Sequence, residues 1–255
     1  MITAGIDIGS ITAKAAIIED GKIKGTLVDF TGYNAKDAGR RVFNALLEKL
    51  GLNAPDIKAL VATGYGRNSV DFADKSLTEI TCHAVGAHFI APETRFIIDV
   101  GGQDSKVIKI DGSGKVIDFA MNDKCAAGTG RFLEVMARAL EVDLDEFGAL
   151  CAHANTPANI SSICTVFAES EIISLISTGE KRENIIAGIH DSVASRISAM
   201  ARRVGVEIPV MMTGGVAKNI GAVHALENKL ECEITVSTYA QVNGAIGAAV
   251  LASRR

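Results

Sequence analysis

The stretch TAGIDIGS at residues 3–10 recurs in outline as RFIIDVGG at residues 95–102, and this repeat decides the fold. Each stretch is an apolar run that reaches an aspartate, Asp7 or Asp99, and then a glycine turn. After each turn the chain returns as a second apolar run and passes through another turn into a third. A strand–aspartate–turn–strand unit that occurs twice predicts two similar α/β lobes with a cleft between them.

The spacing of apolar residues in the rest of the sequence predicts the other strands and the helices of these lobes. Apolar runs predict strands at 13–19, 23–30, 57–64 and 210–213, with a hairpin turn at Asp20-Gly21. Apolar residues at helical spacing predict helices at 35–50, 84–90, 131–140, 166–176, 184–204 and 244–251. The helix at 166–176 is expected to bury Phe167, Ile173 and Ile176. We place the lobes at residues 1–93 and 94–255, and the last helix could pack back on the first lobe.

Composition excludes several classes of function. The chain has 255 residues, a net charge of −4, no Trp and 5% aromatic residues, which disfavours a nucleic-acid partner. It shows no apolar run of membrane-spanning length and no signal peptide, so we expect a cytoplasmic protein without a membrane partner. Five cysteines without paired short spacing argue against a disulfide framework.

Three glycine turns follow apolar runs and predict phosphate-binding loops. They are Gly9-Ser10, Gly101-Gly102 and Gly214-Gly215. Glycine lets the backbone come close to a phosphate, so that N–H groups point at it. Thr12 and Lys14 could add a hydroxyl and an ammonium donor to the first loop. The sequence contains neither a Walker loop nor a dinucleotide-binding fingerprint after the first strand.

Acidic and amide side chains beside these loops predict phosphoryl chemistry. Asp7 and Asp99 end their strands, where carboxylates can hold Mg²⁺ directly or through its waters. Gln103 follows the second glycine turn and either orients the attacking water or is a solvated turn residue. We interpret Lys106 as a surface charge of its strand. The catalytic candidates are therefore Asp7, Asp99 and Gln103.

The loop segments resemble those of the acetate-and-sugar-kinase, Hsc70 and actin superfamily. DIGS at 7–10 and DVGG at 99–102 resemble its two phosphate motifs, and TGG at 213–215 resembles its adenosine motif. The resemblance implies an α/β fold of two ribonuclease-H-like lobes around a nucleotide cleft that closes on MgATP. The ATP contacts expected from the loops and this resemblance are Gly9, Ser10, Ile11, Thr12, Ala13, Lys14, Gly101, Gly102, Thr213, Gly214, Gly215, Lys218 and Gln241, with Asn243 as a further side chain that could reach the nucleotide.

Two cysteines, Cys125 and Cys164, each stand immediately before a predicted helix. A helix N-terminus carries partial positive charge and favours the thiolate, which is the form that binds iron. The adjacent pair Cys82-His83 is interpreted as part of the core, because neighbouring residues on a helix do not face one another. Cys151 and Cys232 are likewise interpreted as ordinary small apolar residues.

The cysteine segments, NDKCAAGTGRF at 122–132 and CTVFAESE at 164–171, resemble the signatures of the 2-hydroxyacyl-CoA dehydratase activators of the BadF/BadG/BcrA/BcrD ATPase family. The resemblance implies a homodimer that shares one [4Fe–4S] cluster, with Cys125 and Cys164 from each subunit as its ligands. It also implies an ATPase that takes an electron from ferredoxin or flavodoxin. The electron would pass, with ATP hydrolysis to ADP, to an acyl-CoA dehydratase or a benzoyl-CoA-reductase-type partner.

Two other functions fit the glycine loops. A small-molecule kinase of the same superfamily, of the pantothenate or sugar type, would need a substrate pocket with a catalytic carboxylate and no cluster. A non-catalytic, ATP-dependent assembly factor or sensor would bind nucleotide alone. Either alternative leaves both cysteine segments without a role.

Overall fold

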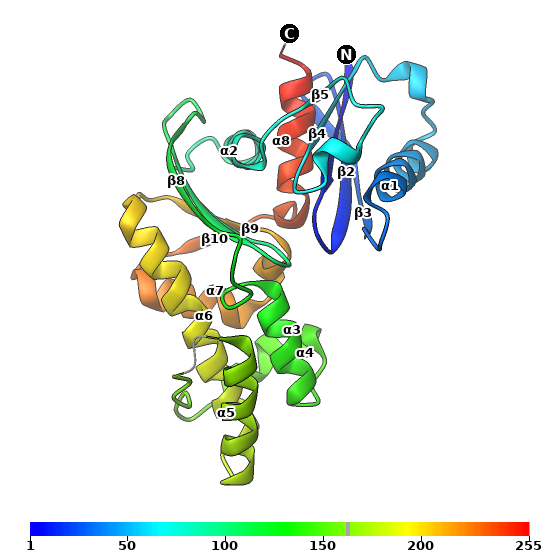
Figure 1. The fold of residues 1–255 in the computed structure, drawn as a ribbon. Coiled ribbons are helices and arrows are strands. Elements are labelled where there is room, and N and C mark those ends of the chain that lie inside the picture. The colour runs from blue at the N-terminus through cyan, green and yellow to red at the C-terminus, as the bar shows by residue number, and fades with distance from the viewer. Residues whose placement is uncertain (162–163, 255) are drawn as a thin grey trace. The chain divides into compact units, whose positions relative to one another are not determined.

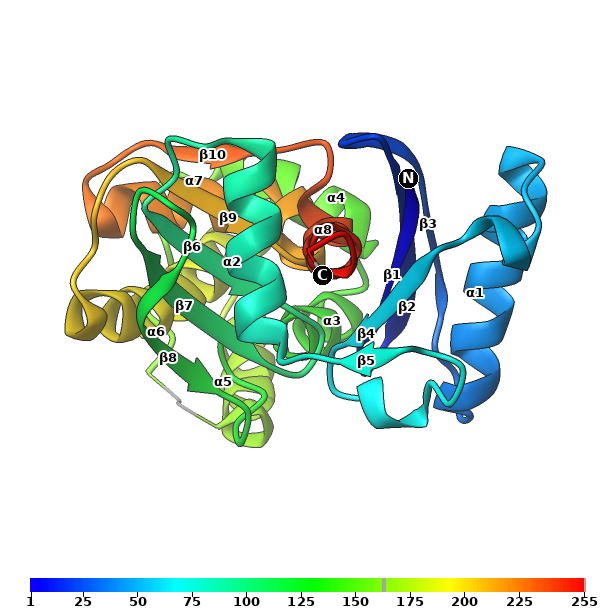
Figure 2. The same cartoon turned by 90° about the horizontal axis from the view of Figure 1, so that it is seen from above.

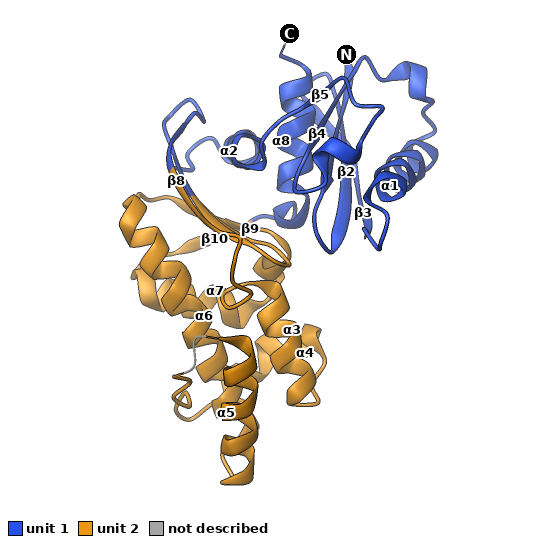
Figure 3. Ribbon diagram, in the orientation of Figure 1, with its two compact units in different colours: residues 1–97, 108–118, 237–255 blue, residues 98–107, 119–236 orange. Residues whose placement is uncertain are grey.

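The computed structural model describes residues 1–161 and 164–254. The chain divides into two compact units, drawn in blue and orange in Figure 3. Unit 1 comprises Met1–Ile97, Ile108–Asp118 and Ser237–Arg255, and unit 2 comprises Ile98–Val107 and Phe119–Val236. A lobe boundary at residues 93 and 94 stays a prediction.

Unit 1 is built on a five-stranded mixed sheet in the order β3-β2-β1-β4-β5 (Figure 1). The first three strands are antiparallel neighbours, whereas β4 and β5 continue the sheet in parallel. The predicted hairpin turn is confirmed, because Asp20 and Gly21 take the positive φ angles of 48° and 76° that a tight hairpin requires. The bounds are β1 Ile2–Ile8, β2 Thr12–Glu19, β3 Lys22–Phe30, β4 Ala59–Thr63 and β5 Lys75–Ser76.

Helices cover both faces of this sheet. Helix α1, Ala35–Leu50, ends at Gly51 with a φ of 64°, and its bounds are those predicted. Successive side chains of β2 point to opposite faces of the sheet. Ile17 therefore packs in the core cluster that includes α1, and Ile18 packs in the cluster that includes helix α8, Asn243–Ala252. Figure 2 shows α8 end-on beside β1. At Gly5 a Cβ would lie 2.1 Å from the Ala245 carbonyl oxygen, so only glycine allows α8 to pack this closely on β1.

The second sheet has the order β10-β9-β6-β7-β8 and belongs mainly to unit 2. Its strands are β6 Phe96–Val100, β7 Ser105–Ile110, β8 Val116–Asn122, β9 Val210–Thr213 and β10 Ile234–Val236. Helices α3 Gly130–Ala139, α4 Leu144–Leu150, α5 Thr165–Ser177, α6 Arg182–Val204 and α7 Ile220–Leu230 complete this unit. Helix α6 buries one face, which carries Ile185, Ile189, Val193 and Ile197.

Helix α5 corrects one prediction about packing. Phe167, Ile173 and Ile176 were expected to be buried, but their exposed fractions are 68%, 59% and 46%. Its buried residues are Ala168 and Ile172 instead. Apolar periodicity alone does not distinguish a face that packs inside one chain from a face that lies open.

Other elements differ from the predictions at their ends. Helix α2, Glu79–Ile90, begins five residues before the predicted start, because the Thr78 hydroxyl accepts a hydrogen bond from the Thr81 amide and caps it. Helix α4 and strand β10 were not predicted. Along the part of the chain that the structure describes, no helix combines the length and apolar character needed to cross a membrane.

Candidate functional site

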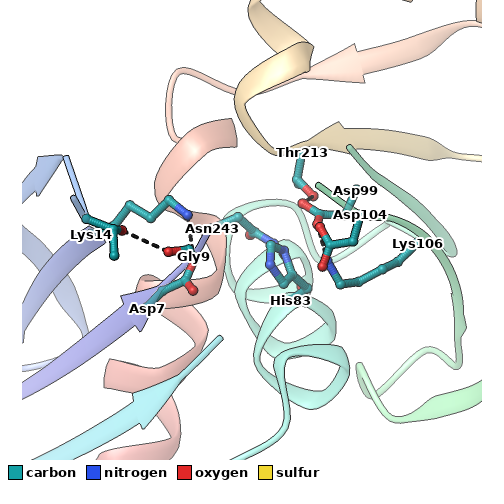
Figure 4. A network of polar contacts seen from close by, with 10 residues as sticks. Asp7, Gly9, Lys14, His83, Asp99, Asp104, Lys106, Thr213 and Asn243 are labelled. Atoms are coloured by element: carbon teal, nitrogen blue, oxygen red, sulfur yellow. Dashed lines mark hydrogen bonds and ion pairs between the residues drawn. The ribbon is translucent and has the colours of Figure 1, made fainter. Parts of the chain in front are cut away.

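The first glycine loop joins β1 to β2 and carries a carboxylate–ammonium pair. Asp7 and Lys14 are directly opposite in the antiparallel register, and the Lys14 Nζ lies 3.3 Å from the Asp7 Oδ2 (Figure 4). The Asp7 side chain is 6% exposed and the Lys14 side chain 14%. The Gly9 amide donates to the Thr12 carbonyl oxygen over 3.0 Å and closes the turn. Asp7, Gly9, Thr12 and Lys14 are therefore brought together as predicted.

Thr31 forms hydrogen bonds with two backbone carbonyl groups of this loop. The Thr31 hydroxyl donates to the Gly9 carbonyl oxygen, and the Thr31 amide donates to that of Ile11. In the described part of the chain the amides of Ser10 and Ile11 donate no hydrogen bond. The carbonyl oxygens of Gly9 and Ile11 thus accept hydrogen bonds from Thr31, while the amides of Ser10 and Ile11 are left to donate. Backbone amides of this kind are the donors that bind a phosphate oxygen.

The second glycine loop, between β6 and β7, carries a more enclosed cluster. The Lys106 Nζ lies 3.1 Å from the Asp99 Oδ2 and 2.9 Å from the Asp104 Oδ2, while the Thr213 hydroxyl donates to the Asp99 Oδ1 over 2.8 Å (Figure 4). The Lys106 side chain is only 2% exposed. The interpretation of Lys106 as a surface charge is therefore wrong. A lysine is stable at such depth because two carboxylates neutralise it.

The two loops follow one pattern with the same offsets. In each, a glycine stands two residues after the aspartate, and its amide donates to the carbonyl five residues after the aspartate: Gly9 to Thr12, and Gly101 to Asp104. In each, the lysine seven residues after the aspartate pairs with it. This spacing of seven was visible in the sequence, and comparing the two repeats would have identified Lys106.

A second pair of glycines occupies equivalent places. Gly64 follows β4 with a φ of 87°, and Gly214 follows β9 with a φ of 89°. A Cβ would lie 2.6 Å from the Ile8 carbonyl oxygen at Gly64 and 2.3 Å from the Val100 carbonyl oxygen at Gly214. Gly214 was predicted as a site residue and Gly64 was not. Both follow a threonine at the end of a buried strand, and this Thr-Gly repeat is the signal that sequence reasoning missed.

The remaining predicted nucleotide contacts lie near these loops in sequence. Gly102 and Gly215 are in the turns after β6 and β9, and Ala13 is buried in β2. Gln103 and Lys218 are exposed, and Gln241 is half-buried in the turn before α8. Within the described residues no hydrogen bond or ion pair joins Gln103, Lys218 or Gln241 to either aspartate, so their roles stay predictions.

The two predicted cluster cysteines both lie in unit 2 and differ in setting. Cys164 is exposed and is the N-cap residue of α5, as predicted. Cys125 is half-buried, and its amide and carbonyl both bond to the Asn122 side chain, over 3.2 and 2.8 Å. It lies four residues before Thr129, the N-cap residue of α3. The statement that Cys125 stands immediately before its helix is therefore wrong, and loop backbone surrounds it instead.

The other three cysteines each have a raised thiol pKa. Burial raises the pKa of the Cys82 thiol to about 12, and it is fully buried in the core, as predicted. Burial also raises the pKa of Cys151 and of Cys232. A thiol with a raised pKa stays protonated and is a poor ligand. Among residues 1–161 and 164–254, no three metal-ligating side chains of the types His, Cys, Asp or Glu come together.

A pocket of about 370 Å³ adjoins the Cys125 loop. Its walls come from the end of β8, the segment 122–127 and one face of α6. The charged lining consists of Lys124, Arg196 and Arg203 against the single carboxylate of Asp123, and Met121 and Met200 supply apolar surface. Positive charge is thus concentrated beside Cys125 in a chain whose net charge is negative.

Comparison with known proteins places this geometry among ATP-dependent activators. A model of the BadF/BadG/BcrA/BcrD ATPase family matches residues 4–252. The activator of lactoyl-CoA dehydratase from Anaerotignum propionicum is 51% identical over 253 residues, covering 99% of this chain and 97% of that protein. Component A of the (R)-2-hydroxyglutaryl-CoA dehydratase from Acidaminococcus fermentans superposes with a TM-score of 0.96 at 48% identity, covering 100% of this chain and 98% of that chain.

Two further solved structures bear on the nucleotide and on the fold. The activator of the 2-hydroxyisocaproyl-CoA dehydratase from Clostridium difficile, with bound ADPNP, superposes with a TM-score of 0.94 at 49% identity, covering 99% and 94% of the two chains. A ROK family glucokinase from Streptomyces griseus, at 12% identity and a TM-score of 0.64 over both whole chains, shares the fold alone. The predicted acetate/sugar kinase–Hsc70–actin type of α/β fold is confirmed by the two mixed sheets and these similarities.

Proposed function

Because the chain belongs to the BadF/BadG/BcrA/BcrD ATPase family, we propose that it hydrolyses ATP in order to activate an acyl-CoA dehydratase, or a related reductase, with a low-potential electron. The observation that supports this most is identity at about half of all residues, over nearly the whole chain, to activators of 2-hydroxyacyl-CoA dehydratases. The choice of acyl-CoA substrate then belongs to the partner enzyme.

For the nucleotide, we propose that ATP and ADP bind with Mg²⁺ at the two glycine loops. The available amides of Ser10 and Ile11 fit phosphate oxygens, and Lys14 adds a positive charge beside them. Asp99 already accepts from Lys106 and Thr213, so it suits contact with Mg²⁺ through a water of the ion. Gln103, exposed in its turn, would orient the attacking water.

For the electron, we propose that two copies of the chain share one [4Fe–4S] cluster. Four thiolates hold such a cluster, and Cys125 and Cys164 are free cysteines of one unit that are not fully buried. A two-fold axis would supply the other pair. The cluster, when bound, supplies a carrier of one electron. The exposed apolar residues of α5, which begins at Cys164, fit a surface that a second copy would cover: Val166, Phe167, Ile173 and Ile176.

The coupling and the electron donor follow from the same proposal. ATP and ADP must bind two conformations with different affinity if hydrolysis is to make electron transfer directional. The donor would be a ferredoxin or a flavodoxin. The basic pocket beside Cys125 is the surface that best fits an acidic carrier of this kind, because complementary charge speeds a transient encounter.

The proposal is tested on protein purified without oxygen. We expect Cys125→Ala and Cys164→Ala each to lose the bound iron and the visible absorbance, because four-thiolate coordination is broken. Cys151→Ala and Cys232→Ala are matched controls that should keep both. ATP hydrolysis and dehydratase activation are measured for all four variants.

Two outcomes would contradict the proposal. Full iron content in both cluster-cysteine variants, together with undiminished dehydratase activation, would show that these thiols hold no cluster. A colourless wild-type protein that phosphorylates a small metabolite would instead favour the kinase alternative.

A further inference from the structure

A buried histidine, His83, lies beside Asp7 in unit 1 and has no role in the proposed function so far. It stands on α2 and is 6% exposed, and Asn243, the first residue of α8, is fully buried against it. Glycine makes this contact possible. A Cβ at Gly86 would lie 2.2 Å from the Asn243 carbonyl oxygen, and one at Gly247 would lie 1.8 Å from that of Cys82.

The hydrogen bonds of Asn243 fix the position of the proton on the His83 ring. The Asn243 Nδ2 lies 3.0 Å from the His83 carbonyl oxygen and 3.2 Å from the His83 Nδ1. A carbonyl oxygen only accepts, so the amide atom facing it must be the nitrogen. The second hydrogen of that nitrogen then points at the Nδ1, which must offer a lone pair. In the neutral ring the proton is therefore on the Nε2.

The protonated Nε2 lies on the Asp7 side of the ring. A Cβ at Gly244 would be 3.0 Å from the His83 Nε2 and also 3.0 Å from the Asp7 Oδ2. The two atoms are therefore at most the sum of these distances, about 6 Å, apart, which is within the span that one water molecule can bridge. Figure 4 shows the Asn243 side chain beside the His83 ring. Asn243 is engaged with His83, and its contact with nucleotide stays a prediction.

We propose that His83 is a positioning residue for ATP hydrolysis: held as the Nε2–H tautomer by Asn243, it donates a hydrogen bond to a water that Asp7 also binds. This inference rests on the proposed ATPase activity. His83 keeps its proton throughout and acts only through the orientation of Asp7 and its water. Such orientation affects the rate of the chemical step more than the affinity for nucleotide, because the histidine does not touch the nucleotide itself.

The test compares two replacements that keep different parts of the ring. A glutamine amide reaches the place of the Nε2, whereas an asparagine amide reaches only that of the Nδ1. We expect kcat for ATP hydrolysis to fall about tenfold to a hundredfold in His83→Asn, with KM for ATP nearly unchanged, and to be largely retained in His83→Gln. His88→Asn, the same change farther along α2, is the matched control and should leave kcat unchanged.

A spectroscopic measurement tests the tautomer independently of activity. The ¹⁵N chemical shifts of the His83 ring should show the Nε2–H tautomer in the wild type. In Asn243→Asp a carboxylate replaces the donating amide, so the ring proton should move to the Nδ1 and kcat should fall as in His83→Asn.

Three results would overturn the inference: equal losses of kcat in His83→Asn and His83→Gln, a wild-type ring with its proton on the Nδ1, or a wild type without ATP hydrolysis. Only the last also removes the proposed ATPase. Failure of the electron-transfer proposal appears elsewhere, as a wild type that hydrolyses ATP but holds no iron and activates no dehydratase.

Discussion

The two aspartate–lysine pairs have the same sequence spacing but very different surroundings. Asp7 and Lys14 in unit 1 are side chains of exposed fractions 6% and 14%, and the ammonium has one carboxylate beside it at 3.3 Å. In unit 2 the Lys106 ammonium lies between Asp99 and Asp104 and is 2% exposed. The backbone turn is repeated, whereas the number of groups around the carboxylate is not.

The backbone turn places both carboxylates in the same way, but the groups around each carboxylate decide how free it is to bind a ligand. The shared turn, with its glycine two residues after the aspartate, places each carboxylate at the end of its strand. In unit 2, Lys106 and Thr213 then bind both oxygens of Asp99, which fixes that side chain. In unit 1 the corresponding Thr63 hydroxyl donates to the Leu77 carbonyl oxygen instead. Asp7 is therefore the carboxylate better placed to exchange partners when a ligand arrives.

The largest expected effect is on the enclosed pair. Lys106→Met removes the ammonium from two carboxylates at a buried position, so we expect the free energy of unfolding to fall by about 4 kcal/mol. Lys14→Met is the matched variant, and its loss should be about 2 kcal/mol, between the values for buried and exposed pairs. Urea denaturation of both variants measures the difference. Equal losses would show that enclosure does not distinguish the pairs.

Two buried histidines, one in each unit, also differ in their hydrogen bonding. His83 in unit 1 is bonded to Asn243, whereas neither ring nitrogen of His190 in unit 2 has a hydrogen-bond partner among the described residues. Burial lowers the pKa of His190 to about 4, and the nearby Asn219 amide offsets this only in part. Above pH 6.5 the ring is neutral in both the folded and the unfolded chain, so its titration does not change stability.

Below pH 6.5 the unfolded chain binds a proton that the folded ring does not accept until about pH 4. The free energy of unfolding should therefore fall as the pH drops from 6.5 toward 4, by about 3 kcal/mol in total. His190→Phe keeps a ring against Phe147 and removes the titrating group, so its stability should depend less on pH in this window. The measurement is urea denaturation at several pH values. Identical slopes in the two proteins would rule out His190 as the source.

Local sequence was sufficient for much of the fold and for the backbone of the site. Alternation and glycine turns predicted the strands that end at Asp7 and Asp99. The hairpin at Asp20-Gly21 and the helix that ends at Gly51 also follow from local chemistry, since each needs a residue that tolerates positive φ. These features depend on neighbours in sequence, which is why they could be predicted.

Features that depend on distant neighbours could not be predicted in the same way. Asp99 and Asp104 are close to Lys106 in sequence, but a lysine in a strand is usually solvated, and only the packing of the folded sheet buries this one between the two carboxylates. The apolar face of α5 has the periodicity of a core helix, yet Phe167 and Ile173 are exposed. The contact between His83 and Asn243 joins residues 160 positions apart. Periodicity records that a face is apolar and not what covers it.

The smallest expected effect concerns the Thr213 hydroxyl, which donates to Asp99, whereas the Thr63 hydroxyl does not donate to Asp7. Thr213→Val should lower the free energy of unfolding by about 2 kcal/mol, because Asp99 loses a donor to a charged oxygen, and Thr63→Val by about 1 kcal/mol. A double-mutant cycle isolates the interaction. Thr213→Val combined with Asp99→Asn should show a coupling energy of about 1 kcal/mol, whereas Thr63→Val combined with Asp7→Asn should show almost none. If both cycles gave the same coupling energy, the threonine hydroxyls would act alike, and the greater freedom inferred for Asp7 would need another cause.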